Sequence, residues 1–152
     1  MIGRLILFLA LNFGALAIGG LFTGGGVNSD WYANLNKAPW TPPGWVFGAA
    51  WTSIMICLSI YMTIAWNKVE NRNLFLSLYA IQLLLNIGWN PIFFYFHNAL
   101  LGLVVISALT VLVTYLMLGY SGTMKWSSLL LLPYAIWLMI ATSLNGYILL
   151  KN

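Results

Sequence analysis

Charged side chains are scarce in this chain of 152 residues: they make up 5% of it, against 62% apolar residues. A soluble domain carries about 25% charged residues, because it must cover a surface that faces water. The shortage therefore excludes a water-soluble domain and predicts an integral membrane protein set in a lipid bilayer. The surplus of basic residues, a net charge of +4, is spread singly along the chain, so we expect no nucleic-acid partner.

Cysteine and histidine occur once each, as Cys57 and His97. A single cysteine forms no disulfide within the chain, and metal sites need several thiolate or imidazole ligands. We therefore expect no metal site and no required cofactor, with His97 as a loop residue. Asp30 and Glu70 fall in different loops, so they do not form the carboxylate pair of an acid–base enzyme. Arg4 precedes an apolar run, as the basic residue of a signal peptide does. No small-residue cleavage site leads into a soluble domain, however, so we do not expect a signal peptide here.

Long apolar runs separate the few charges. A membrane-spanning helix needs about 20 mostly apolar residues, and these runs are continuous rather than alternating, which favours helices over a β-barrel. We predict a single all-α domain, an integral membrane bundle of five transmembrane helices. The predicted spans lie near residues 5–22, 44–66, 74–96, 99–120 and 127–150, and a lid loop covers residues 23–43.

The stretch from Asp30 to Trp51 holds four of the eight tryptophans and three of the five prolines. Proline lacks an N–H and forces the residue before it out of the α region. We therefore expect a rigid, non-helical lid at the membrane surface, preceded by a flexible start at the glycines 24–26. The aromatic side chains suit two roles: anchors at the membrane interface, or the wall of a pocket for a flat aromatic ligand.

Polar residues within the membrane gather on the third predicted helix. They are spaced by four, three and one residues, as Gln82, Asn86, Trp89 and Asn90. This spacing places them on one helix face, and the face must point into the bundle because lipid offers amides no hydrogen bonds. Two roles explain this polar face equally well. Its side chains could form hydrogen bonds to neighbouring helices, or they could form a ligand site. We expect Pro91 to break this helix.

A second stripe occurs on the fifth predicted helix, at steps of three, four and four residues. Its members are Tyr134, Trp137, Ala141 and Asn145. A wide aromatic ring beside a small alanine side chain forms a slot. The fourth predicted helix is almost wholly aliphatic, and we expect it to serve mainly as scaffold.

The basic residues predict the orientation in the membrane. Four fall on the side of the N-terminus and two on the side of the lid: Arg4, Lys68, Arg72 and Lys125 against Lys37 and Lys151. Basic loops stay in the cytoplasm, so we expect a cytoplasmic N-terminus and an outward-facing lid. With neither an extended tail nor a targeting peptide, the chain favours a prokaryotic cytoplasmic membrane.

Three segments resemble the TspO/MBR family, the translocator proteins also called tryptophan-rich sensory proteins or peripheral-type benzodiazepine receptors. These segments are WYANLNKAPWTPPGWVFGAAW at 31–51, LLLNIGWNPIFF at 83–94 and LLPYAIWLMIATSLN at 131–145. The resemblance covers nearly the whole chain. It implies a five-helix bundle, commonly a homodimer, with a pocket under the first loop. The implied ligands are tetrapyrroles such as protoporphyrin IX, sterols in animal members, and synthetic flat aromatic molecules.

Motif positions carry the family's pocket residues over to this chain. They fall on Tyr32, Pro42, Trp51, Asn86, Trp89, Trp137 and Ala141. The family's sterol motif is matched by Leu144, Tyr147 and Lys151, a pattern that many last turns of membrane helices match by chance. Many relatives have an acidic residue and a tryptophan in the fourth helix, where Leu101 and Val105 stand here. A role of those groups in transport or regulation therefore does not carry over.

Three functions stay open at this point. The first is the binding of porphyrin-type tetrapyrroles for their transport or sensing, which needs only the aromatic pocket. The second, implied by the resemblance, is the light- and oxygen-dependent breakdown of protoporphyrin IX, with Trp51 and Trp137 as the oxidisable residues. The third is a structural or regulatory membrane partner whose tryptophans are only interface anchors.

Overall fold

Five long helices dominate the computed structural model, which describes residues 1–152. They are α1 (Ile2–Val27), α3 (Gly44–Lys68), α4 (Arg72–Asn90), α5 (Ala99–Gly119) and α7 (Leu132–Lys151). Together with the short helical segments that extend α4 and α7, they form five stretches long and apolar enough to cross a membrane. The predicted all-α bundle of five transmembrane helices is confirmed.

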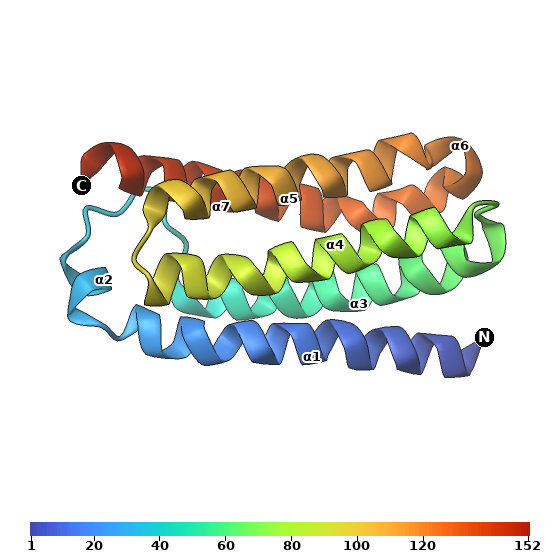
Figure 1. Ribbon diagram of the computed structural model, residues 1–152, viewed down its shortest axis with the longest axis horizontal. Coiled ribbons are helices and arrows are strands. Elements are labelled where there is room, and N and C mark those ends of the chain that lie inside the picture. The colour runs from blue at the N-terminus through green and yellow to red at the C-terminus, as the bar shows by residue number, and fades with distance from the viewer.

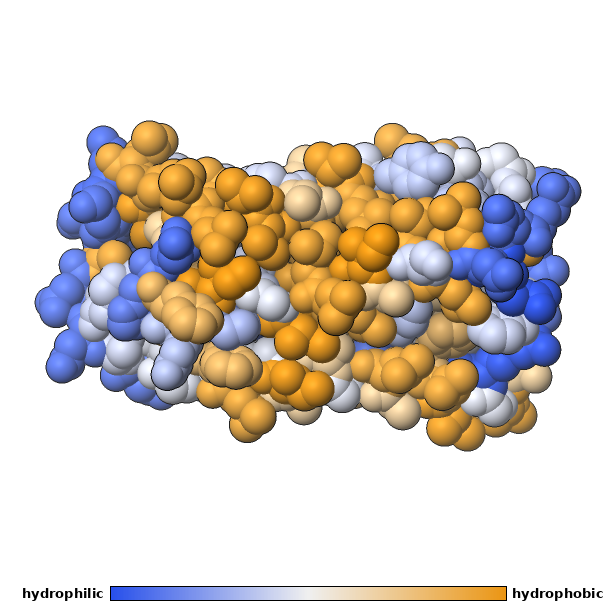
Figure 2. All heavy atoms as spheres, in the orientation of Figure 1, coloured by the Kyte–Doolittle hydropathy of each residue, from blue (hydrophilic) through white to orange (hydrophobic).

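The five helices lie side by side along the long axis of the molecule (Figure 1). Each packs against two neighbours, which closes a ring in the order α1, α3, α7, α5, α4. The N-terminus and α6 (Ser121–Met124) lie at one end, which we call the α6 end; α2 (Asp30–Asn34) and the C-terminus lie at the other, the lid end (Figure 1). Apolar side chains cover the middle of the face shown in Figure 2, and hydrophilic ones collect at both ends.

The first helix is longer than predicted. α1 continues through the glycines at 24–26 to Val27, where the sequence predicted a flexible start of the lid, and that prediction was wrong. Gly26 is buried, and a Cβ atom there would collide with the ring of Phe94. Glycine at this position therefore serves the close packing of α1 against the end of α4. Helical backbone also keeps its own amides hydrogen-bonded near the membrane, which a flexible linker does not.

The lid contains a short helix, α2, so the prediction of a wholly non-helical lid was also wrong. Ser29 caps this helix: its hydroxyl accepts a hydrogen bond from the Tyr32 backbone N–H at 3.2 Å and donates one to the Gly26 carbonyl at 2.6 Å. Asp30 in the first turn complements the positive end of the helix dipole. Serine followed by aspartate is a common helix start, so the signal was present in the sequence. The lid from Leu35 to Pro43 has no helix.

Pro91 does not break α4. A π-helical segment, Pro91–Tyr95, continues the helix directly. The wider turn buries two consecutive rings, since Phe93 and Phe94 are 2% and 7% exposed. Trp31 meets Phe93 edge-on with ring centres 5.5 Å apart, and Tyr32 packs against Phe94 at 5.6 Å. The π-helical segment is therefore the support on which α2 rests.

The connection between α5 and α7 is helical almost throughout. α6 is followed by η2, the 3-10 helix Lys125–Leu131, so the fifth span, predicted to start at residue 127, is preceded by further helical residues. At the corner between α6 and η2, Lys125 has a φ of 52°. Side chains with a Cβ atom rarely adopt this left-handed region, so the backbone is strained there.

Polar side chains in the middle of the bundle pair with one another. The Tyr79 hydroxyl donates to Asn12 Oδ1, and Asn12 Nδ2 donates to the Ser59 hydroxyl, both at 2.8 Å. Gln82 Nε2 donates to the Tyr134 hydroxyl at 2.8 Å. These bonds join separate helices and satisfy groups that lipid cannot. Hydrogen bonding between helices therefore accounts for the amide nitrogen of Gln82, the first member of the predicted polar face, while its oxygen Oε1 is buried without a partner.

Candidate functional site

A cavity of about 660 Å³ lies at the lid end, bordered by the lid and by α1, α3, α4, α5 and α7. Pockets for small molecules typically measure roughly 300 to 1,000 Å³. Its lining includes all seven pocket residues that the resemblance implies: Tyr32, Pro42, Trp51, Asn86, Trp89, Trp137 and Ala141. The structure thus brings together residues from four separate segments of the chain.

Two tryptophans form the wall that α3 and α7 contribute. The ring of Trp51 meets Tyr134 edge-on with centres 5.9 Å apart, and Trp137 meets Phe47 edge-on at 5.1 Å. Edge-on contacts of this kind fix the orientation of both indoles. Ala141 lies one turn along α7 from Trp137, and its short side chain leaves room beside the indole. This wall therefore offers fixed, flat apolar surfaces to a ligand.

Trp89 provides a third aromatic surface, from α4. Its ring stacks on Phe93 with centres 5.3 Å apart and planes 12° from parallel. Its indole N–H donates to Asn145 Oδ1 at 3.2 Å, and Asn145 Nδ2 donates to the carbonyl of Ala99 at 2.8 Å. Asn145, a member of the predicted stripe on α7, therefore positions Trp89 and does not line the cavity.

The amides on the polar face of α4 differ in their partners. Asn90 Oδ1 accepts a hydrogen bond from the Thr23 hydroxyl at 2.6 Å, and Asn90 Nδ2 donates to the carbonyl of Asn86 at 2.9 Å. Gln82 is bonded to Tyr134. The side chain of Asn86 lines the cavity, is only 6% exposed, and forms no hydrogen bond with the protein. Asn86 therefore offers its amide to a ligand in the cavity, whereas the unpaired oxygen of Gln82, Oε1, is buried away from the cavity.

The wall formed by α1 was not predicted from the sequence. Six residues of α1 line the cavity: Ala15, Leu16, Gly19, Gly20, Thr23 and Val27. Small residues of α1 both pack against neighbouring helices and line the cavity. A Cβ atom on Gly19 would lie 2.6 Å from Asn90 Nδ2, whereas one on Gly20 would meet nothing within 4 Å. The spacing of small residues was the only available signal, and it does not distinguish the two uses.

Lys37 is the only charged residue that lines the cavity. Its ammonium lies 4.6 Å from the centre of the Tyr32 ring and donates to the carbonyl of Ala33 at 3.4 Å. A cation over an aromatic face is stabilised by the ring, so the positive charge is held at the lid. Burial raises the pKa of the Tyr32 hydroxyl above its ordinary value of 10.0. Tyr32 is therefore neutral at physiological pH and can donate a hydrogen bond.

The lid is fastened to the end of α7. The backbone N–H of Asn36 donates to Asn152 Oδ1 at 2.8 Å. The indole of Trp40 meets Tyr147 edge-on with ring centres 5.3 Å apart. Tyr147 is the centre of the predicted sterol motif, and none of the three motif residues, Leu144, Tyr147 and Lys151, lines the cavity. Tyr147 thus has a structural role under the lid, and sterol binding stays a prediction.

Ionisable groups do not gather at the cavity. Asp30 lies at the lid end, in α2, whereas Glu70 lies in the loop between α3 and α4, at the α6 end (Figure 1). His97 stacks on Trp31 with ring centres 4.2 Å apart. No three His, Cys, Asp or Glu side chains lie close enough to hold a metal ion. The chemistry available in the cavity is therefore aromatic stacking, hydrogen bonding by amide and hydroxyl groups, and one positive charge.

Comparison with known proteins identifies the family. The TspO/MBR family matches residues 6–150. A tryptophan-rich protein TspO from Archaeoglobus fulgidus is 38% identical over 153 residues, covering 100% of this chain and 96% of the relative. A tryptophan-rich sensory protein from Cereibacter sphaeroides is 38% identical over 76% of this chain and 73% of its own length. The translocator protein of Homo sapiens is 33% identical over 76% of this chain and 70% of its own length. The chain is an integral membrane protein and belongs to the TspO/MBR family.

Proposed function

We propose that this protein binds porphyrin-type tetrapyrroles such as protoporphyrin IX in the cavity at the lid end, for their transport or sensing. The main support is one cavity that combines three indole rings with the unpartnered amide of Asn86. A flat macrocycle stacks well on indoles, because both present large apolar faces. Its carboxylates would accept hydrogen bonds from the Asn86 amide and lie near the ammonium of Lys37.

Light-dependent oxidation of the bound porphyrin is a second candidate. Trp51 and Trp137 both line the cavity, so a photosensitising ligand would touch two oxidisable rings. This activity needs the same bound ligand as transport or sensing, and binding is therefore tested first. The third candidate function treats every tryptophan as an interface anchor. This role fits Trp40 and Trp45, which are 54% and 75% exposed, better than it fits the tryptophans that line the cavity.

The distribution of charge supports an orientation with the lid outside. The α6 end carries more basic residues than the lid end, with Arg4, Lys68, Arg72 and Lys125 against Lys37 and Lys151. By the positive-inside rule, the N-terminus lies in the cytoplasm, and we assign the protein to a prokaryotic cytoplasmic membrane. The homodimer that the resemblance implies stays a prediction.

The proposal is tested by titrating the purified protein with protoporphyrin IX and with its dimethyl ester, followed by quenching of tryptophan fluorescence. We expect saturable quenching by both ligands. Tryptophans that act only as interface anchors would give quenching without saturation, which would refute the proposal.

The carboxylate contact is tested with Lys37→Gln. Because the ester carries no free carboxylate, this variant should weaken binding of the diacid about five-fold, or about 1 kcal/mol for a partly exposed ion pair, and leave the ester unchanged. Lys151→Gln is the matched control, since it removes an exposed lysine at the same end that does not line the cavity.

A further inference from the structure

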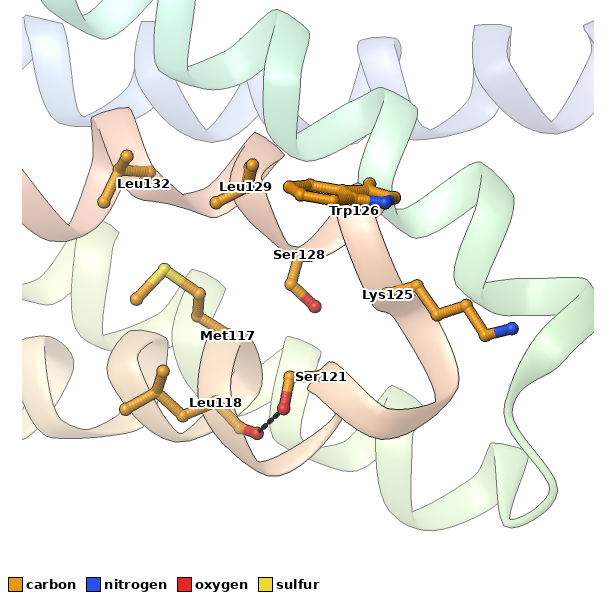
Figure 3. Close-up of a pocket in the computed structure, with 8 residues that line it drawn as sticks. All are labelled: Met117, Leu118, Ser121, Lys125, Trp126, Ser128, Leu129 and Leu132. Atoms are coloured by element: carbon orange, nitrogen blue, oxygen red, sulfur yellow. Dashed lines mark hydrogen bonds between the residues drawn. The ribbon is translucent and has the colours of Figure 1, made fainter.

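A second cavity, of about 500 Å³, lies at the α6 end (Figure 3). Its lining divides into an apolar part and a polar part. The apolar part consists of Met117 and Leu118 from α5 together with Leu129 and Leu132. The polar part consists of Ser121, Lys125, Trp126 and Ser128. None of these residues lines the cavity at the lid end, so this is a separate site.

Ser128 is the first sign that this cavity takes a ligand. The residue is only 6% exposed, and its hydroxyl has no hydrogen-bond partner. Figure 3 shows this hydroxyl pointing into the space between η2 and the α5 residues. Serine in a helix normally bonds to a backbone carbonyl of the preceding turn, as Ser121 does with Leu118 at 2.6 Å. The unpaired hydroxyl is therefore a donor that a ligand oxygen in the cavity would satisfy.

Lys125 is the second sign. Its backbone has φ 52° and ψ −129°, a conformation that is costly for any residue with a Cβ atom. Strain of this kind concentrates at binding sites. The side chain is exposed at the rim beside Trp126, which is 85% exposed. A lysine next to a tryptophan at the end of a membrane helix is typical of the level of lipid headgroups.

We propose that this cavity binds an anionic phospholipid from the leaflet at the α6 end. One acyl chain lies against the apolar part, where the flexible Met117 adapts to its shape. Oxygens of the headgroup accept hydrogen bonds from Ser128 and from the ammonium of Lys125. An anionic lipid is favoured over a zwitterionic one, because Arg4 and Arg72 add positive charge to the same end.

Native mass spectrometry of the full chain in detergent tests this proposal, with dioleoyl phosphatidylglycerol or dioleoyl phosphatidylcholine added at equal concentration. We expect preferential retention of phosphatidylglycerol. Lys125→Gln should lower that retention about five-fold, the factor that corresponds to about 1 kcal/mol for one basic residue near an anionic surface. Lys68→Gln is the matched control, because Lys68 is an exposed lysine at the same end that does not line the cavity.

A second pair of variants tests the hydroxyl. Ser128→Ala should lower retention of phosphatidylglycerol several-fold, whereas Ser127→Ala, at the neighbouring position outside the cavity, should not. An unchanged thermal midpoint verifies that each variant is folded. Equal retention of the two lipids, or equal losses in Lys125→Gln and Lys68→Gln, would overturn the proposal. Displacement of the lipid by an equal concentration of glycerol 3-phosphate would also overturn it, because the site would then be one for a free anion.

Discussion

The indole N–H of Trp40 lies 3.1 Å from the hydroxyl oxygen of Ser143 and donates a hydrogen bond to it, which ties the lid to α7. Trp40 is 54% exposed, so this contact closes the lid at a solvent-accessible point. Contacts of this type open locally while the rest of the structure stays folded. We therefore expect that loss of this contact loosens the lid without any change in the helix bundle.

Ser143→Ala should speed release of protoporphyrin IX about three-fold, because it removes one hydrogen bond worth about 0.5–1.5 kcal/mol from the closed lid. Dissociation into excess detergent, followed by stopped-flow fluorescence, measures this rate. Ser53→Ala is the control, since Ser53 is an exposed serine of α3 that bonds only to the carbonyl of Ala49. Equal release rates from the two variants would show that the Trp40 contact does not hold the lid.

Asn86→Leu should weaken binding of protoporphyrin IX several-fold and change little for an apolar flat aromatic of similar size, because only the former has oxygens for the amide. Fluorescence titration with both ligands measures this difference. Gln82→Leu should behave differently: it removes a bond to Tyr134, costs about 0.6 kcal/mol of stability, and leaves the selectivity intact. Equal losses for both ligands in Asn86→Leu would assign Asn86 a structural role.

Gly26→Ala should lower the thermal stability by about 1–3 kcal/mol, because its Cβ atom would overlap the ring of Phe94 in a packed contact. Gly25→Ala should instead raise the stability, by up to about 1 kcal/mol. No atom lies within 4 Å of a Cβ atom there, and alanine is a better helix former than glycine by about that amount. Thermal unfolding in detergent measures both. If Gly25→Ala were destabilising, the helical extension of α1 would be refuted.

The double variant Trp51→Phe, Trp137→Phe separates binding from photochemistry. Phenylalanine keeps much of the apolar area on which a macrocycle stacks, so most of the porphyrin affinity should remain. An indole is much easier to oxidise than a phenyl ring, so light-dependent loss of porphyrin should fall sharply if these residues react. Absorbance of bound porphyrin under illumination, at equal occupancy and with a dark control, measures this loss. Equal decay in the wild type and the variant would exclude the two indoles from the reaction.

The sequence alone determined the five spans and the class of fold. Runs of about 20 apolar residues have a single outcome in a bilayer, because only helices satisfy their own backbone there. Helical spacing also determined that Gln82, Asn86 and Trp89 share one inward face. The segments that resemble the TspO/MBR family pointed to the seven residues that the structure places around one cavity.

Only the tertiary structure decided how each of these residues is used. Gln82 and Asn86 are the same kind of amide on the same face, yet Gln82 meets Tyr134 across the bundle whereas Asn86 meets empty space. Likewise, Gly19 and Gly20 both line the cavity, yet a Cβ atom on Gly19 would collide with Asn90 whereas one on Gly20 would meet no atom within 4 Å. Periodicity specifies which side of a helix a residue occupies. What it contacts depends on residues far away in the sequence, which become neighbours only when the helices have packed.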